Sequence, residues 1–118
     1  MSRLAQLEFD ERERVLVAHV TGELDLSNVH DVGDAIAGAV TGAMAGLVLD
    51  LTGLTHLDSA GVRMLFDLRA KLAAARQRLA VVVGAGAPIR EVLILVAVPA
   101  TIRVHDEVDA AVTDVASG

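Results

Sequence analysis

The sequence predicts an α/β fold in which a mixed, mostly parallel sheet of about five strands carries about four helices. Short apolar runs of strand length alternate with longer segments whose apolar residues recur every three or four positions, as in strand–helix–strand units. The first two apolar runs follow each other without a helix between them, which adds one antiparallel strand. The 118 residues suffice for one domain and are too few for two of ordinary size, so we expect a single domain over residues 1–118.

The first two predicted strands form a hairpin. Residues 7–10 and 15–21 are short runs rich in apolar and β-branched side chains, and the charged residues 11–14 separate them. Two such runs with a short polar connection are typical of a β-hairpin, so we expect a solvated turn between them. Gly22 is expected to end the second strand.

The first predicted helix covers residues 26–40. Its apolar side chains recur at intervals of three or four, and these are Val29, Val32, Ile36 and Val40. Asp25 or Ser27 is placed to cap its start, and Gly42 is placed to stop it.

The rest of the chain repeats the pattern. Residues 47–51 and 79–83 predict strands buried on both faces, and residues 101–104 predict the last strand. A loop follows residue 51, and a long helix begins after Asp58 and Ser59. Its buried stripe is Val62, Leu65, Leu68, Leu72 and Ala75. Pro88 suits the first turn of a helix through about residue 95. The terminal helix carries Val108, Ala111, Val112 and Val115.

Composition excludes several classes of function. The chain has no cysteine, which excludes disulfide scaffolds and thiol catalysis, and its four histidines form no spaced pair for a metal. With a net charge of -6, no Trp and no Tyr, we expect no nucleic-acid binding. No apolar run approaches the roughly 20 residues of a membrane span, and the first eight residues lack a signal core. We therefore expect a cytoplasmic domain that needs no cofactor, metal or membrane.

Two enzyme-like patterns are weak. The turn Gly84-Ala85-Gly86 lacks the third glycine of a dinucleotide site, and the single lysine, Lys71, lies in a helix rather than a Walker loop. Ser59 with His105 and Asp106 lacks the nucleophile elbow of a hydrolase. We expect the chain not to be an enzyme.

Residues 50–61 lead from a buried strand into the start of the long helix. A helix start has unpaired backbone N–H groups and the positive end of the dipole, which favour a capping oxygen and would also stabilise a phosphate. Ser59 thus has two interpretations, a helix cap or a phosphate acceptor.

At these residues the chain resembles STAS domains of the anti-sigma factor antagonist type, the bacterial anti-anti-sigma factors. The matching segments are Asp50-Leu51-Thr52, Leu57-Asp58-Ser59-Ala60-Gly61 and the turn Gly22-Glu23-Leu24-Asp25. The resemblance covers essentially the whole chain and implies the STAS fold. In that family, the serine at the position of Ser59 is phosphorylated by the cognate anti-sigma factor, a serine kinase. Ala60 departs from the family pattern, where a second Ser or Thr is common.

The resemblance implies a function in transcription regulation through protein–protein interaction, as in bacterial stress responses. The unphosphorylated form binds an anti-sigma factor and frees a sigma factor for RNA polymerase. The phosphorylated form releases the anti-sigma factor, and a serine phosphatase resets the cycle. We expect a monomer or weak dimer. The alternatives are a STAS scaffold or accessory subunit in a stress-signalling or lipid-transport complex, and a small-ligand module that uses the Gly84 loop.

The resemblance also implies which residues contact the partner. Asp25 and Asn28 match a second loop that lies beside the phosphorylation site in the family, although both can also cap a helix. Asp58 can cap the long helix, position the hydroxyl for the kinase, or do both. Ala60 and Gly61 complete the motif.

Two apolar features have alternative explanations. Met64 lies on the side of the long helix opposite its apolar stripe, so it is either an exposed partner contact or packed against a neighbouring helix. Residues 92–98 are more hydrophobic than one helix face requires, which indicates core packing or an interface.

Overall fold

The computed structural model describes residues 5–117. In this part of the chain one six-stranded sheet has the order β1-β2-β3-β5-β6, and β4 pairs with β2 off this path. The strands are β1 (Ala5–Arg12), β2 (Val15–Leu24), β3 (Gly46–Asp50), β4 (Leu54–Leu57), β5 (Arg78–Val82) and β6 (Arg103–His105). The helices are α1 (Val29–Ala39), α2 (Ser59–Ala74), α3 (Pro88–Leu95) and α4 (Val108–Ala116), with a short 3-10 turn, η1 (Val98–Ala100). The mixed α/β architecture of the STAS fold is confirmed, with a sixth strand in addition.

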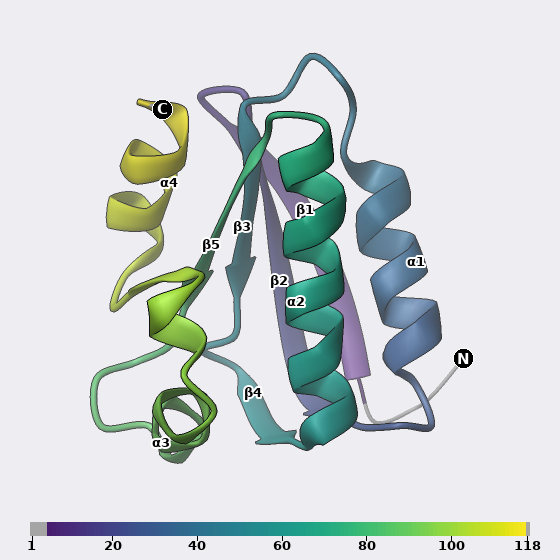
Figure 1. Cartoon of the computed structure of the whole chain (residues 1–118), viewed down its shortest axis with the longest axis vertical. Coiled ribbons are helices and arrows are strands. Elements are labelled where there is room, and N and C mark those ends of the chain that lie inside the picture. Colours follow the sequence, from purple (N-terminus) through teal and green to yellow (C-terminus); the bar gives the residue numbers. More distant parts are fainter. Residues whose placement is uncertain (1–4, 118) are drawn as a thin grey trace.

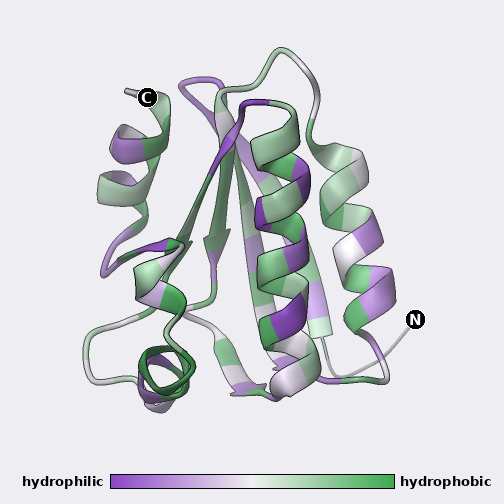
Figure 2. Cartoon of the chain, in the orientation of Figure 1, coloured by the Kyte–Doolittle hydropathy of each residue, from purple (hydrophilic) through white to green (hydrophobic). Residues whose placement is uncertain are grey.

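The sheet separates two apolar layers (Figure 1). Helices α1 and α2 lie side by side on one face, and α4 covers part of the other. Alternation along β2 serves both layers, because Leu16 and Ala18 face the first and Val15 and Val17 face the second. Strands β3 and β5 are buried on both faces, as their continuous apolar runs predict. Figure 2 shows this distribution, with hydrophobic strands in the centre and polar positions on the outer sides of the helices.

The hairpin of β1 and β2 is confirmed, with a tighter turn than predicted. Arg12 pairs with Val15, so only Glu13 and Arg14 form the connection. Their φ angles of 52° and 66° are both positive, as in the type I′ turns that suit the twist of a hairpin. The charged turn is thus solvated, and the strands extend on both sides of it.

The prediction that Gly22 ends the second strand is wrong. Strand β2 continues to Leu24, and its register shifts between Gly22 and Glu23. Gly22 has a φ of 92°, which glycine adopts without a steric penalty. The strand therefore bends at Gly22 and changes its parallel partner from β3 to β4.

Strand β4 lies in the segment expected to be a loop. Leu54 and Leu57 are buried at its ends, and Thr55 and His56 between them are exposed. Four residues with this pattern show neither alternation nor a continuous apolar run, so no strand signal is present in the sequence. Pairing with β2 carries the chain directly to the point where α2 begins.

The helix boundaries differ most at α1. It begins at Val29 rather than residue 26, and neither Asp25 nor Ser27 caps it through a side chain. It ends at Ala39, and Val40 is already extended, so the helix stops before Gly42. Pro88 is the first residue of α3, as predicted.

The apolar run at residues 92–98 is only partly in the core. Leu93 and Val98 are buried, whereas Ile94, Leu95 and Val96 are exposed at the end of α3. Figure 2 shows α3 as a strongly hydrophobic helix. No helix within residues 5–117 has the length and apolar content needed to cross a membrane.

A polar cluster on the sheet face that carries α4 links three strands. His19 of β2 lies between two carboxylates, with Nδ1 2.6 Å from Asp50 of β3 and Nε2 3.0 Å from Asp10 of β1. The hydrogen bond to Asp10 is the main cause that raises the pKa of His19, and Asp50 adds to it against the effect of burial. Burial raises the pKa of Asp50, but hydrogen bonds from Thr52 and His19 together outweigh it and lower that pKa.

Candidate functional site

The candidate site lies at the carboxyl ends of the parallel strands, where loops of α/β proteins commonly form binding sites. The loop between β2 and α1 and the loop between β4 and α2 are neighbours there, at the lower end of the molecule in Figure 1. The backbone N–H of Asp58 donates to the carbonyl of Leu24 over 3.3 Å. The two loops matched by the family resemblance therefore form one surface.

Asp58 is the N-cap of α2. Its Oδ1 accepts hydrogen bonds from the backbone N–H groups of Ala60 and Gly61, over 3.0 and 3.1 Å. These bonds satisfy two donors that have no partner inside the helix. The capping role predicted as one alternative for Asp58 is confirmed.

Ser59 is the first residue of α2, so its interpretation as the helix cap is wrong. Its side chain is exposed, and no residue in the described part of the chain bonds to its Oγ. The Ser59 hydroxyl is thus accessible at the helix start and does not help to hold the fold of residues 5–117.

Gly61 fixes the position of this helix start. It is buried, and a Cβ at Gly61 would overlap the side chain of Leu57 and meet Leu24. The absence of a side chain therefore lets α2 begin close against the ends of β4 and β2. Gly61 is buried, and Ala60, which precedes it, is half-buried.

The loop between β2 and α1 is held by Asn28, which is 2% exposed. Its Oδ1 accepts from the backbone N–H of Asp25 over 3.1 Å, and its Nδ2 donates to the carbonyl of Glu23 over 2.8 Å. Asn28 is the residue before α1, but it makes no side-chain cap bond to the helix. Its side chain is bonded inside the loop and does not face outward.

Asp25 lies nearer the surface of the same loop. Its Oδ1 accepts hydrogen bonds from the hydroxyl and the backbone N–H of Ser27. These bonds, with a further contribution from the charge of His56, lower the pKa of the Asp25 carboxyl. The loop thus presents a stable negative charge beside the β4 end.

A groove of about 680 Å³ runs between α1 and α2, with Ser59 among its lining residues. Met64 is 5% exposed, and its Cγ would lie 3.3 Å from a Cβ placed on Gly33 of α1. Of the two alternatives for Met64, packing against the neighbouring helix is confirmed, and the exposed position is wrong. Gly33 allows the two helices to approach over this side chain.

The structure adds residues that the sequence did not single out. Leu26, expected as the first residue of a helix, instead lies in the loop, lines the groove and is 72% exposed. Nothing in the sequence distinguishes an exposed leucine from a core leucine at this position. Arg63 and His30 also line the groove. The four-residue spacing of Ser59 and Arg63 on one helix was a usable signal for Arg63.

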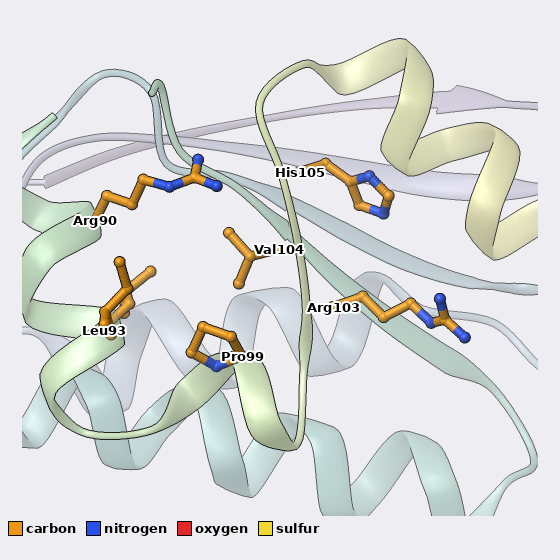
Figure 3. A pocket seen from close by; sticks show the side chains of 7 residues that line it. Arg90, Leu93, Pro99, Arg103, Val104 and His105 are labelled. Atoms are coloured by element: carbon orange, nitrogen blue, oxygen red, sulfur yellow. The ribbon is translucent and has the colours of Figure 1, made fainter. Parts of the chain in front are cut away.

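A second cavity of about 530 Å³ lies between α3 and β6, but its charged groups do not converge. Figure 3 shows Val104, Leu93 and Pro99 around the cavity, while Arg103 and His105 extend to the other side of β6. There, both approach Asp114, at 3.5 and 2.9 Å.

The remaining cation of that cavity also has a partner. Arg90 lies 2.6 Å from Asp106 and donates to the carbonyl of Val83. The cavity therefore offers an apolar wall and no free polar group to orient a ligand. Residues 84–86 do not line this cavity, so it does not bear on the small-ligand alternative that uses the Gly84 loop.

Comparison with known proteins places the chain in a family. The family model of the STAS domain matches residues 6–111. The chain belongs to the STAS domain family. A search of curated protein sequences found no match.

Among solved structures, this STAS domain is similar to an anti-sigma factor antagonist from Mycobacterium paratuberculosis. The two share 26% identity over 94% of this chain and 93% of the other, with a TM-score of 0.83. The anti-sigma factor antagonist SpoIIAA in its unphosphorylated form gives 23% identity over 97% and 98%, with a TM-score of 0.69. A putative anti-sigma factor antagonist from Thermotoga maritima gives 16% identity over 92% and 93%, with a TM-score of 0.79. The last two similarities bear on the fold alone.

Proposed function

We propose that this STAS domain is an anti-sigma factor antagonist that is switched by phosphorylation of Ser59. Its unphosphorylated form binds an anti-sigma factor that is also a serine kinase, and a sigma factor is released. The phosphorylated form leaves the kinase, and a serine phosphatase restores the first state. The chain acts in the cytoplasm of a bacterium, as in a stress response. It is the substrate of the kinase and supplies no catalytic group.

The observation that carries this proposal is the division of roles between Asp58 and Ser59. Asp58 caps the helix with its carboxylate, so the Ser59 hydroxyl takes no part in holding the fold. A phosphate can therefore be added to Ser59 without removing the cap. The modification changes the surface and leaves the domain folded.

Electrostatics explains how the phosphate would end binding. Phosphorylation adds a charge of about -1.5 to -2 at neutral pH. Asp58 precedes Ser59, and Asp25 lies in the adjacent loop, so the new charge joins two carboxylates. Burying this group against a partner costs free energy unless the partner supplies cations for it.

The groove mouth, which we define as the part of the groove lined by Leu26, Asp58 and Ser59, supplies the surface that the unmodified form offers. Leu26 presents an exposed apolar side chain in the same groove as Ser59, and the hydrogen bonds of Asn28 hold the backbone of its loop in place. An exposed leucine on such a loop is suited to entering an apolar pocket of a partner, because little backbone flexibility is lost on binding. Partner contact by Asp25, Asp58 and Ala60 is part of the same proposal.

Intact-mass spectrometry tests the switch. The chain is incubated with ATP and each anti-sigma kinase of its own genome, beside Ser59→Ala and the control Thr55→Ala. Thr55 is an exposed residue on β4, four residues before Ser59, and its hydroxyl donates to the carbonyl of Gly22. We expect one added phosphate in the wild type and in Thr55→Ala, and none in Ser59→Ala.

Calorimetry then compares the affinity of the kinase for the unmodified and the phosphorylated chain. We expect at least about tenfold weaker binding after phosphorylation, which corresponds to about 1.4 kcal/mol. Equal affinity of the two forms would refute the switch. No phosphorylation by kinases that are active on control substrates would favour the scaffold or accessory-subunit function instead.

A further inference from the structure

We propose that Arg63 receives the phosphate of phosphorylated Ser59 on the surface of the domain itself. This inference rests on the proposed function for its use in the cell, but the pairing can be tested without a kinase. It assigns a role to an arginine that the fold does not otherwise use.

Three backbone N–H groups that follow Ser59 at the helix start already have acceptors. The N–H groups of Ala60 and Gly61 donate to the Asp58 carboxylate, and that of Val62 donates to the Asp58 carbonyl. A phosphate on Ser59 could use them only by displacing the cap. A side-chain cation near Ser59 would therefore offer the phosphate donors that the cap does not already use.

Arg63 is placed to provide it. It follows Ser59 by four residues on α2, so the two side chains lie on the same helix face with Cβ atoms about 5–6 Å apart. Both line the groove between α1 and α2. An anion that precedes a cation by four residues is the favourable order on a helix. A guanidinium also matches phosphate with two parallel N–H donors.

Arg63 is uncommitted before the modification. Its side chain is exposed, and no hydrogen bond or ion pair joins it to another of residues 5–117. Asp67 lies one turn further along α2, yet the two form no ion pair in this structure. No existing interaction has to break for Arg63 to turn toward Ser59.

The other charged groups of the groove are less suitable. His30 and Asp34 line it from α1, Asp58 lines it just before α2, and Asp67 and Lys71 line it from α2. The three carboxylates repel a phosphate. Lys71 is twelve residues from Ser59 along the helix, about 18 Å of rise. Arg63 is therefore the cation of α2 within reach.

The pairing changes the groove mouth in two respects at once. Phosphorylation adds a negative group, and it also engages a cation that an unmodified chain leaves open to a partner. Both changes act at the end of the groove where Leu26 is exposed. The released state is thus held by the domain and does not depend on repulsion alone.

A phosphorus NMR titration tests the pairing. Phosphoserine is incorporated at position 59 during translation, so that no kinase is needed, in the wild type, Arg63→Gln, Arg63→Lys and Lys71→Gln. The second pKa of phosphoserine is about 6, and a cation about 5 Å away lowers it by about half a pH unit. We expect the Arg63→Gln midpoint to lie higher than the wild type by that amount. Lys71→Gln should match the wild type, and Arg63→Lys should lie between.

The outcomes separate this inference from the proposed function. Equal midpoints in the wild type and Arg63→Gln would overturn the role of Arg63, even if a kinase phosphorylates Ser59 efficiently. A raised midpoint would support it, even if no kinase is found. Circular dichroism of each variant confirms folding, and the Arg63 Nε–H signal in a nitrogen–proton spectrum should shift on phosphorylation in the wild type and in Lys71→Gln.

Discussion

The groove mouth beside Ser59 and the end of α3 are both exposed, but the fold constrains them differently. At the groove mouth, the side chains of Asn28, Asp25 and Asp58 are bonded to backbone groups of the two loops. At the end of α3, Ile94, Leu95 and Val96 expose apolar side chains, and the backbone N–H groups of Val96 and Ala97 donate to carbonyls of the helix.

This difference shows which features distinguish a candidate functional site from an exposed hydrophobic surface. Exposed apolar area is larger at α3, yet nothing there is reactive and the nearby cations are paired with carboxylates. At the groove mouth, fixed polar groups surround one free hydroxyl and one free guanidinium. Preorganisation around an unsatisfied group is the stronger sign of function.

The largest effect is expected from Asn28→Ala, which would remove the side-chain hydrogen bonds that hold the loop between β2 and α1. The change leaves the Asp25 N–H and the Glu23 carbonyl without their partner in a partly buried place. Each buried group left unsatisfied costs about 1–3 kcal/mol, so we expect a loss of about 2–4 kcal/mol in the free energy of unfolding. Urea unfolding measures it. Leu95→Ala at the end of α3 should change this free energy by less than about 0.5 kcal/mol. A similar loss in both variants would remove the contrast between the regions.

A glycine pair tests how the start of α2 is positioned. Gly61→Ala would place a methyl group against Leu57 in the core, and overpacking typically costs about 1–3 kcal/mol. Gly38→Ala on α1 meets no atom within 4 Å and should instead stabilise by about 0.5–1 kcal/mol. Thermal unfolding of the two variants gives the comparison. Stabilisation by both substitutions would show that the helix start tolerates a side chain.

Alanine substitutions of two leucines compare the two regions directly in a binding measurement. Leu26 and Leu95 are 72% and 82% exposed, so replacing either by alanine removes a similar surface side chain. We expect Leu26→Ala to weaken binding of the anti-sigma factor by about tenfold or more, as for a residue near the centre of an interface. Leu95→Ala should leave the affinity within about twofold. The reverse result in a calorimetric titration would move the partner surface to α3.

Much of the fold could be predicted from the sequence because its signals are local. The stripes of α1, α2 and α4, the double-sided burial of β3 and β5, and Pro88 at the start of α3 all follow from spacing or residue type. Strand β4 could not be predicted, because its four residues become a strand only through pairing with the bent end of β2. Register and bending depend on contacts distant in the sequence.

In the candidate site, too, some features follow from the local sequence and others depend on contacts distant in the sequence. The motif placed Asp58 and Ser59 at a helix start, but which of the two caps it depends on the backbone angles of Asp58. Asn28 was expected near the partner surface, and its burial follows from the path of the loop back to Glu23. The exposure of Leu26 also depends on that path. Side-chain direction in a loop is set by tertiary bonds, which no periodicity encodes.

The smallest effect is a pH dependence from His19, at a distance from both regions. The pKa of His19 is raised, so the folded state binds this proton more tightly than the unfolded chain. Its contribution to stability is complete below the ordinary value of 6.5 and is lost as the pH rises through the raised value. The pKa values of Asp10 and Asp50 are lowered, so their contribution is present above 3.8 and is lost as the pH falls through the lowered values.

The cluster of His19, Asp10 and Asp50 should therefore stabilise the domain most between the lowered pKa values of the two aspartates and the raised pKa of His19. His19→Gln should remove the loss of stability at the upper end of this pH range. Asp50 also accepts bonds from the backbone and hydroxyl of Thr52, so it anchors the loop that leads toward β4 and Ser59. We expect wild type to exceed His19→Gln in unfolding free energy by more at about pH 5.5 than at about pH 8.5, with a change below about 1 kcal/mol because the groups are partly solvated. Urea unfolding at both values measures it, and in an Asp10→Asn background the change should shrink. An identical pH dependence in wild type and His19→Gln would show that the proton on His19 does not contribute to the stability of the domain.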